Sequence, residues 1–374
     1  MHDGAGAREG ERVLAAIAEL FPSAEIFTLG GPGPLDPALA RRITHPSWLR
    51  AVPRASRFVH RLLPFMPRLI ESFDLSGFDL VISSSYSVAK GIRKPAGSVH
   101  VSYVHEPMSF VWRKLDEGAG PPRLALVTRP AARALRDHLR RWDQQASSAG
   151  RIDQLIATSE LVAAQIEHCY GREALVVHPF VDSARFVRPE RTREYYLLLA
   201  TLARTEHVEL AVRAFERLGL PLWIAGSERD ARRLPDLALH RNVRWLHAAS
   251  PEALAALYAG ARALVLPGMD EFSLVAVEAA ASGLPVLGHA AGGVPETVVD
   301  GVTGLLFRPC TAQALVGAVR ALEEGHVHFE PRRLRAHAQR FSKATFQRKF
   351  LAAVRRAWLD AGKDAARLPT DLPH

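Results

Sequence analysis

The chain has 374 residues and a formal net charge of +9, and 48% of its residues are hydrophobic against 23% charged. This length exceeds the usual limit for one hydrophobic core and the composition excludes extensive disorder, so we expect two folded domains. Cys169 and Cys310 have no C-x-x-C spacing, and no apolar run is long enough to span a bilayer. We therefore expect a cytoplasmic protein without a disulfide framework. The positive charge favours an acidic partner such as phosphate or a membrane surface over nucleic acid, although an arginine-rich proteome would explain it equally well.

In the first half of the chain, short apolar segments with strand character alternate with helical patterns. The predicted strands are 24–29, 78–84, 98–105, 154–159 and, leaving this region, 173–182. The predicted helices are 8–20, a basic segment near 54–72, and 123–145. The same alternation restarts after a polar linker at 182–194.

The second half repeats this alternation with more elements. Its predicted strands are 195–201, 221–226, 242–247, 261–268, 284–290 and 303–307. Its predicted helices are 207–218, 228–238, 251–259, 274–282, 311–323, 331–340 and 344–361. Such alternation is typical of parallel sheets covered by helices on both faces. We therefore expect an α/β protein with two doubly wound, Rossmann-like domains that face each other across a cleft. The predicted parts are an N-terminal domain at 1–182, a C-terminal domain at 183–342, and a helix with its tail at 343–374 that returns toward the first domain.

A predicted anion site follows the strand at 261–268. Ligands of doubly wound domains bind outside the carboxyl ends of the strands, and here a loop leads into a helix. We expect this helix to begin near Ser273 or Leu274 and to end at Gly283. The amides at its start and the partial positive charge of a helix N-terminus favour an anion. These amides are those of Ser273, Leu274 and Val275.

Two acidic residues flank the predicted anion site. Asp270 lies in the loop before the helix, and Glu278 lies about one turn inside it. A carboxylate on each side suits a sugar nucleotide, because one can accept from sugar hydroxyls and the other from ribose hydroxyls while the amides bind the diphosphate. The alternative is an ordinary helix with acidic residues near its N-terminus, where they are favoured anyway, and the spacing alone favours that alternative.

Several motifs together resemble the retaining glycosyltransferases of family 4, which have the GT-B fold. Asp270 and Glu278, followed by AAASGLPVL, are similar to the family's Glu-x7-Glu signature. GGVPETVVDGVTGLLF (292–307) is similar to its Gly-Gly loop, VSYVHEP (101–107) to a strand ending in His-x-Pro, and HPFVDSARF (178–186) to the crossover into the second domain. The resemblance covers nearly the whole chain and is strongest to bacterial mannosyltransferase-like members of polysaccharide biosynthesis.

The resemblance implies transfer of a hexose, with mannose as one candidate, from a nucleoside diphosphate sugar such as GDP-mannose. The implied acceptor is lipid-linked or a polysaccharide, and no cofactor or metal is implied. The resemblance assigns His105 and Asp270 to the donor sugar and Glu278 to the ribose, and Gly292 and Gly293 to close approach of the backbone to the phosphates. Taken alone, His105 would be a core histidine. No carboxylate stands in a clear nucleophile position, which argues against a two-carboxylate hydrolase.

The residues predicted to bind the donor diphosphate depart from the family pattern. Family members usually place an Arg, and about five residues later a Lys, after the first strand of the second domain. Thr201 and Glu206 occupy these positions here, and Glu206 would repel a diphosphate. Arg204 and His207 are the nearby candidates to replace the lost positive charge.

Two further departures concern the acid pair and the N-terminus. Asp270 reaches about 1.5 Å less far than a Glu would, and Ser273 stands where the family has Gly. Family members begin with a buried strand before a glycine-rich loop, whereas we expect this chain to begin within the loop, with Gly10 left of the usual Gly pair. Either the start codon is misplaced or the first domain lacks its first central strand, and we favour the former.

The segment 48–69 mixes three aromatic residues with five arginines. Such a composition is typical of a segment that lies on an anionic membrane, which would place the protein peripherally on the inner membrane face. The alternative is an amphipathic helix packed on the first domain with its arginines in solvent.

Two other functions stay open. The departures at Thr201, Glu206 and Asp270 are compatible with a catalytically inactive binding or scaffold protein of the same fold. A sugar-nucleotide 2-epimerase would keep the fold and the donor site but would need no acceptor.

Overall fold

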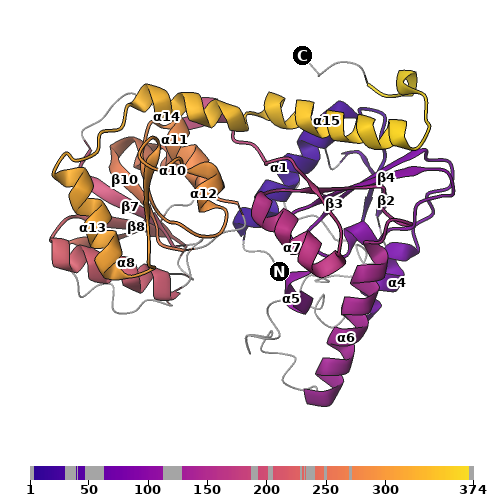
Figure 1. Cartoon of the computed structure of the whole chain (residues 1–374), viewed down its shortest axis with the longest axis horizontal. Helices are drawn as coiled ribbons and strands as arrows, with labels where there is room; N and C mark the ends of the chain where they lie inside the picture. The colour runs from indigo at the N-terminus through magenta and orange to yellow at the C-terminus, as the bar shows by residue number, and fades with distance from the viewer. Residues whose placement is uncertain are drawn as a thin grey trace. The chain divides into compact units, whose positions relative to one another are not determined.

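The computed structural model describes residues 4–29, 39, 41–46, 63–112, 129–186, 193–200, 205–227, 230, 232, 241–247, 251–268 and 272–369. The chain divides into two compact units. The N-terminal unit comprises Arg8–Val177 and Gln347–His374, and the C-terminal unit comprises Met1–Ala7 and His178–Phe346. Each unit is an α/β structure with a parallel sheet, so the expected fold class is confirmed (Figure 1). The domain bounds given by the sequence pattern stay a prediction.

A four-stranded parallel sheet in the order β3-β4-β5-β6 forms the centre of the N-terminal unit. Its strands are β3 (Leu80–Ser85), β4 (Val99–Val104), β5 (Gln154–Ala157) and β6 (Leu175–Val176). A separate parallel pair consists of β1 (Ile26–Thr28) and β2 (Ile43–Pro46). The helices are most of α1 (Gly4–Leu20), α4 (Met66–Glu71), α5 (Ser109–Trp112), α6 (Arg129–Ala146), α7 (Glu160–Tyr170) and most of α15 (Lys343–Asp360). The short 3-10 helices are η2 (Leu63–Phe65), η3 (Ala89–Gly91) and η8 (Ala365–Arg367).

The strands of this sheet end level with one another at their carboxyl ends. Ser85 pairs with Val104, Val104 with Ala157, and Ala157 with Val176. All six residues of β4 are buried, as expected of a central strand that is covered on both faces. Side chains that follow these strands are therefore brought to one edge of the sheet.

The strand predicted at 173–182 is wrong in its extent, because β6 is only Leu175–Val176. Val177 still donates a backbone hydrogen bond to the Ala157 carbonyl at 3.0 Å. Pro179, two residues later, has no N–H with which to continue the ladder. The chain therefore leaves the sheet earlier than its apolar sequence suggests.

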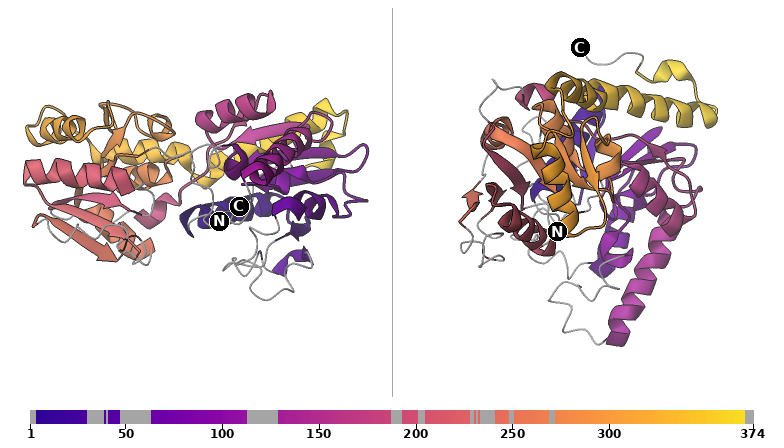
Figure 2. Two further views of the ribbon diagram at one scale, coloured as in Figure 1. Left: turned by 90° about the horizontal axis from the view of Figure 1, so that it is seen from below. Right: turned by 60° about the vertical axis from the view of Figure 1, so that its left-hand side comes forward.

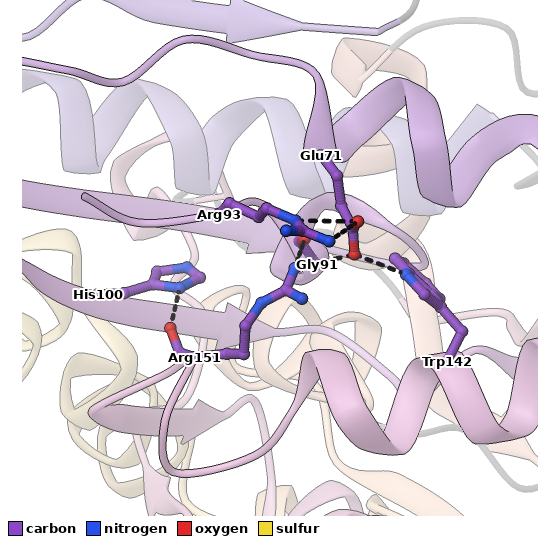
Figure 3. A network of polar contacts seen from close by, with 6 residues as sticks. All are labelled: Glu71, Gly91, Arg93, His100, Trp142 and Arg151. Atoms are coloured by element: carbon purple, nitrogen blue, oxygen red, sulfur yellow. Dashed lines mark hydrogen bonds and ion pairs between the residues drawn. The ribbon is translucent and has the colours of Figure 1, made fainter. Parts of the chain in front are cut away.

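A polar network joins the segments at the amino-terminal edge of this sheet (Figure 3). The Glu71 carboxylate accepts from Arg93 Nη2 at 2.8 Å, Trp142 Nε1 at 2.9 Å and Arg151 Nη2 at 3.1 Å. Burial raises the pKa of Glu71, but these hydrogen bonds outweigh that effect and lower it. The Arg151 carbonyl accepts from His100 Nδ1 at 3.0 Å, and burial lowers the pKa of His100 to about 4. The network is thus built around a neutral imidazole and an ionised carboxylate.

The C-terminal unit is built on a six-stranded parallel sheet in the order β12-β11-β10-β7-β8-β9. Its strands are β7 (Tyr195–Leu199), β8 (Leu222–Gly226), β9 (Val243–His247), β10 (Ala261–Leu266), β11 (Val286–His289) and β12 (Gly304–Phe307). Its helices are α8 (Thr205–Leu218), α10 (Pro251–Gly260), α11 (Leu274–Ala281), α12 (Val294–Thr297), α13 (Ala312–Glu323) and α14 (Pro331–Ala338), with η5 (Ser183–Phe186) and η7 (Gln339–Phe341). The helix predicted at 228–238 falls largely outside the described residues.

The strand order places a topological switch point between β7 and β10. These strands are neighbours, yet α8, which follows β7, packs against α13, whereas α11, which follows β10, packs against α14 (Figure 1). Two buried apolar clusters correspond to these two faces, one with Phe215 and Leu315 and the other with Val277 and Leu334. In open parallel sheets, ligands bind at the carboxyl ends of the strands at such a switch point.

The helix α15 belongs to the N-terminal unit from Gln347 onward. Gln347 Nε2 donates to the Ala16 carbonyl at 3.0 Å, and the ring of Phe350 lies 6.1 Å from that of Tyr103. Both views in Figure 2 show α15 beside the strands and helices of that unit. Within the ranges that the structure describes, no helix has the length and apolarity needed to cross a bilayer. Of the segment 48–69, only residues 63–69 lie among the described residues.

Candidate functional site

The helix α11 begins at Leu274 and ends at Ala281, as its sequence predicts. Its run of alanines favours helix, and Gly283 stops it with a φ of +75°. The Gly283 N–H donates to the Ala280 carbonyl and the Leu284 N–H to the Ala279 carbonyl, both at 2.9 Å, which forms a Schellman motif. The helix therefore ends at a defined residue, and its N-terminus follows the carboxyl end of β10 in the chain.

Ser273 is the N-cap residue of α11, and its side chain does not cap the helix. The residue is 1% exposed, and its hydroxyl has no hydrogen-bond partner among the described residues. A buried hydroxyl without a partner is unfavourable by about 1–3 kcal/mol, so this position favours a ligand that can accept its hydrogen bond. This hydroxyl is the clearest sign of a ligand at the predicted anion site.

One of the three predicted amide donors is already used. The Leu274 N–H donates to the Phe272 carbonyl at 3.1 Å, so the expectation that it is free is wrong. The cause is the conformation of Ser273, whose φ of −90° and ψ of 79° form an inverse γ-turn. The amides of Ser273 and Val275 stay predicted donors.

Glu278 lies one turn further along α11 and is 7% exposed. Its Oε2 atom accepts from the hydroxyl of Tyr258, on α10, at 3.2 Å. Burial and then the charge of Glu278 raise the pKa of Tyr258 well above its usual value, so the phenol stays a donor. Tyr258 thus orients the carboxylate of Glu278. The two residues are 20 positions apart in the sequence, and no sequence pattern predicted their contact. Asp270, the other predicted acid, lies outside the described residues.

The Gly-Gly loop follows β11 in the same unit. Gly292 has a φ of +64°, a left-handed conformation that favours glycine, and Gly293 precedes α12. His178 Nε2 lies 3.1 Å from Glu296 Oε2 on α12, and its ring stacks against that of Phe272 with centroids 5.0 Å apart. The loop is thus anchored to the segment that precedes α11.

His105 lies at the carboxyl end of β4 in the N-terminal unit and is 3% exposed. Its Nε2 atom is 2.8 Å from the Ser84 hydroxyl, and its ring stacks on Tyr86 with centroids 3.8 Å apart and an interplanar angle of 6°. The Thr158 hydroxyl donates to the His105 carbonyl at 3.2 Å. The imidazole is therefore held on one face and at one ring nitrogen by residues that the sequence alone did not indicate.

Gly10 lies against the ring of Tyr86. A Cβ atom at Gly10 would lie 2.6 Å from Tyr86 Cε2, and the Gly10 N–H donates to the Tyr86 hydroxyl. Burial, and then the charges of Glu9 and Glu106, raise the pKa of Tyr86. Gly10 lies inside α1, as the helix predicted at 8–20 implies, and α1 begins four residues earlier than that prediction, at Gly4. Glycine is needed here because any side chain would meet the Tyr86 ring.

Only some of the residues predicted to bind the diphosphate lie among the described residues. Thr201 and Arg204 lie outside the described residues, whereas Glu206 and His207 lie in the first turn of α8, after β7. The structure thus gathers Ser273, Glu278 and the Gly-Gly loop at one edge of the C-terminal sheet. It gathers Gly10 and His105 around Tyr86 in the N-terminal unit.

Comparison with known proteins gives two family matches that follow one another along the chain. A model described as "Glycosyltransferase Family 4" matches residues 10–185, and one described as "Glycosyl transferases group 1" matches residues 181–345. A D-inositol 3-phosphate glycosyltransferase of Actinosynnema mirum is 36% identical over 187 residues, which are 41% of this chain and 45% of that protein. A glycogen synthase of Mycobacterium tuberculosis is 30% identical over 238 residues, 59% of this chain and 57% of that protein. The chain therefore spans only about half the length of these relatives.

A solved structure supports the same assignment at the level of fold. The sucrose-phosphate synthase of Thermosynechococcus elongatus superposes with a TM-score of 0.64 at 18% identity, over 96% of this chain and 94% of that one. The two family matches together run from residue 10 to residue 345. The chain belongs to glycosyltransferase family 4 and has the GT-B fold.

Proposed function

We infer that the protein is a glycosyltransferase that moves a hexose from a nucleoside diphosphate sugar to an acceptor. The observation that carries this proposal is the start of α11, where the buried Ser273 hydroxyl has no partner in the described part of the chain. It lies one turn before Glu278, a carboxylate already oriented by Tyr258. An anion acceptor for the hydroxyl and hydroxyl donors for the carboxylate are both present in a sugar nucleotide.

The proposed roles follow these contacts. Glu278 accepts from the ribose hydroxyls, while Ser273 and the amides of Val275 and Gly293 donate to the phosphates. Asp270 accepts from hydroxyls of the donor sugar, and His105 is the residue of the N-terminal unit that we assign to that sugar. Electrostatic stabilisation of the leaving diphosphate is the main contribution that such groups make to transfer.

We further propose that the donor is GDP-mannose, that the acceptor is lipid-linked or a polysaccharide, and that the enzyme works peripherally at a membrane in polysaccharide biosynthesis. The net charge of +9 and the basic, aromatic composition of 48–69 support the membrane part, and the donor and acceptor follow from the family resemblance. Sedimentation with anionic and with neutral vesicles tests the membrane part. Equal binding to both, or binding to neither, would contradict it.

The first experiment is calorimetry with GDP, UDP and ADP, each compared with its nucleoside. A diphosphate that binds clearly more tightly than its nucleoside supports a working phosphate site and identifies the base of the donor. Turnover of the corresponding nucleotide sugar is then compared between wild type and Glu278→Gln. Loss of a charge-assisted hydrogen bond of about 1.5–3 kcal/mol predicts a fall in kcat/KM of roughly 10- to 100-fold.

Glu323→Gln is the matched control for Glu278→Gln. Glu323 also accepts from a tyrosine hydroxyl, that of Tyr196 at 2.6 Å, and it pairs with Arg262. Arg262 and Tyr196 lie at the amino-terminal ends of β10 and β7, the edge opposite to α11's N-terminus. The control is expected to change stability and to leave kcat/KM as in wild type. Equal kcat/KM for Glu278→Gln and wild type would contradict the assignment of this site.

A catalytically inactive binding protein is the second candidate. The observation in its favour is Glu206, an acidic residue in the first turn of α8 at the position where a basic residue is expected to bind the diphosphate. This alternative predicts binding of the nucleoside part, no turnover of any nucleotide sugar, and no gain from Glu206→Lys. A gain in diphosphate affinity with Glu206→Lys would favour the enzyme.

A further inference from the structure

Three side chains that can carry positive charge meet at the carboxyl edge of the C-terminal sheet. The registers set their positions: Leu266 pairs with Gly288, and His289 pairs with Phe307. His289 is therefore the last residue of β11, and Arg308 follows the last residue of β12 directly beside it. The rings of His289 and Phe307 lie 5.9 Å apart, which fixes the imidazole at this edge.

The third side chain reaches the same edge from α8. A Cβ atom at Gly268, two residues beyond the end of β10, would lie 2.9 Å from His207 Nδ1. The glycine thus leaves room for the His207 ring over the end of β10. Because β10 lies between β7 and β11, this ring reaches from α8 toward the end of β11. The three residues are His207, His289 and Arg308.

The electrostatics of His289 show that these groups interact unfavourably without a ligand. Burial, and then the positive charges of His207 and Arg308, lower the pKa of His289. Its Nδ1 atom is buried and has no hydrogen-bond partner among the described residues. An anion placed among these groups would relieve the repulsion and favour the protonated imidazole.

Three other polar side chains lie on the elements around His289. Glu206 precedes His207 in the first turn of α8. The Cys310 thiol, after β12, donates to the Pro267 carbonyl at 3.2 Å. On α12, Glu296 pairs with His178. The buried Ser273 residue is the N-cap of α11, which packs against α14, whereas α8 packs against α13, so the two helices cover opposite faces of the sheet.

We propose that His207, His289 and Arg308 form the cationic part of the phosphate site, and that the histidines take up protons when a nucleoside diphosphate sugar binds. This inference rests on the proposed function. The diphosphate diester of a nucleotide sugar carries about two negative charges between pH 6 and 8. Histidines paired with it supply positive charge only when protonated, so binding gains affinity as the pH falls.

The expected effect has a defined sign and size. The free protein holds His289 largely neutral at pH 7, and the bound anion raises the pKa of the imidazole. Protein with bound nucleotide sugar therefore carries more protons than free protein, and affinity rises as the pH falls from 8 to 6. A tenfold rise in the proton affinity of the imidazole on binding lowers the dissociation constant by up to about tenfold over that range. Arg308 adds attraction that does not change with pH.

Calorimetry with GDP-mannose, UDP-glucose and ADP-glucose tests this, each at pH 6 and 8 and in two buffers of different ionisation enthalpy. A nucleotide sugar is used because a free nucleoside diphosphate would itself titrate near pH 6. The wild-type protein is expected to take up protons on binding at pH 7. His289→Gln is expected to lower that uptake and to flatten the pH dependence, and Arg308→Gln to weaken binding equally at both pH values.

Two exposed residues of the same unit serve as matched controls. His326→Gln and Arg320→Gln remove the same charges near the C-terminal end of α13, and both are expected to bind as wild type does. Gly268→Ala is a second perturbation that leaves all three charges in place but forces the His207 ring to move, and it is expected to lower proton uptake. Thermal unfolding of each variant checks that it is folded.

The outcomes separate the two proposals. If none of the three nucleotide sugars binds, the proposed function is contradicted and this inference falls with it. If one binds without proton uptake, or with an uptake that His289→Gln and Gly268→Ala both leave unchanged, the function stands and the cationic site is wrong. Lower uptake in these two variants, with wild-type behaviour in the two controls, supports the site.

Discussion

Replacing Gly10 with alanine tests whether α1 positions His105 through Tyr86. The new methyl group would lie 2.6 Å from Tyr86 Cε2, whereas ordinary contacts begin near 3.4 Å, so the ring must move by about 0.8 Å. Tyr86 stacks on His105 at 3.8 Å with nearly parallel rings, so the displacement is passed on to the imidazole. A shift of about 1 Å in a group that contacts the substrate can lower a rate by about 10²-fold, and we expect kcat for sugar transfer to fall by roughly 10- to 100-fold.

The stability of the same variant gives a second, independent measure. Alanine in place of glycine inside a helix normally stabilises a protein by about 0.5–1 kcal/mol. We expect Gly10→Ala to lose that gain, because disturbing a stacked aromatic pair costs about 0.5–1.5 kcal/mol. Denaturant unfolding measures the difference, and the NMR signals of the His105 ring report the change in the ring current of Tyr86.

Gly317→Ala is the control, since Gly317 lies within α13 and a Cβ atom there would meet nothing within 4 Å. It is expected to gain stability and to keep the wild-type kcat and His105 signals. If Gly10→Ala behaves in the same way, with unchanged kcat, unchanged His105 signals and a gain in stability, α1 does not position His105 through Tyr86.

Two further predictions concern stability. His100 has a pKa of about 4 when folded against a usual value of 6.5. The native state therefore binds fewer protons, and roughly 3 kcal/mol of stability that is present above pH 6.5 is lost as the pH falls toward 4. Denaturant unfolding at pH 7 and 4.5 should show a smaller loss for His100→Gln, and equal losses would contradict this. Lys90 and Asp143 form a fully buried ion pair at 2.7 Å. Lys90→Met should cost about 3–5 kcal/mol and Lys90→Met with Asp143→Leu clearly less, and additive losses in this double-mutant cycle would oppose it.

Much of the fold could be predicted because its strands are short, apolar and buried. The segment predicted at 195–201 is β7, Tyr195–Leu199, whose five residues are all buried. The helix α7 was missed although its signals are present. Ser159 caps it by accepting a hydrogen bond from the Val162 N–H, and Gly171 ends it with a φ of +63°. Val162, Ile166 and Cys169 form its buried face.

The candidate site was predictable only in its local parts. The start of α11 and the spacing of Asp270 and Glu278 are contained in one short segment. The contact of Tyr258 with Glu278 and that of Tyr86 with His105 join residues 20 and 19 positions apart on different elements. No periodicity or capping rule relates such pairs, because the fold alone brings them together. The γ-turn at Ser273 could not be predicted, because no sequence signature separates it from an ordinary N-cap.

The helix α15 is synthesised last but belongs to the N-terminal unit, and this sets the order in which the two units can be completed during translation. A ribosome makes residues 8–177 first, then the continuous stretch 178–346 of the other unit, and only then the segment from Gln347 onward. That segment contacts Ala16 through Gln347, Tyr103 through Phe350, and Asp79 through Arg367 at 2.6 Å. Until that segment emerges, the apolar surface around Tyr103 stays uncovered while the whole second unit is synthesised. Exposed apolar surface favours aggregation, so a chaperone would protect the chain most during this period. The unit that is begun first is completed last.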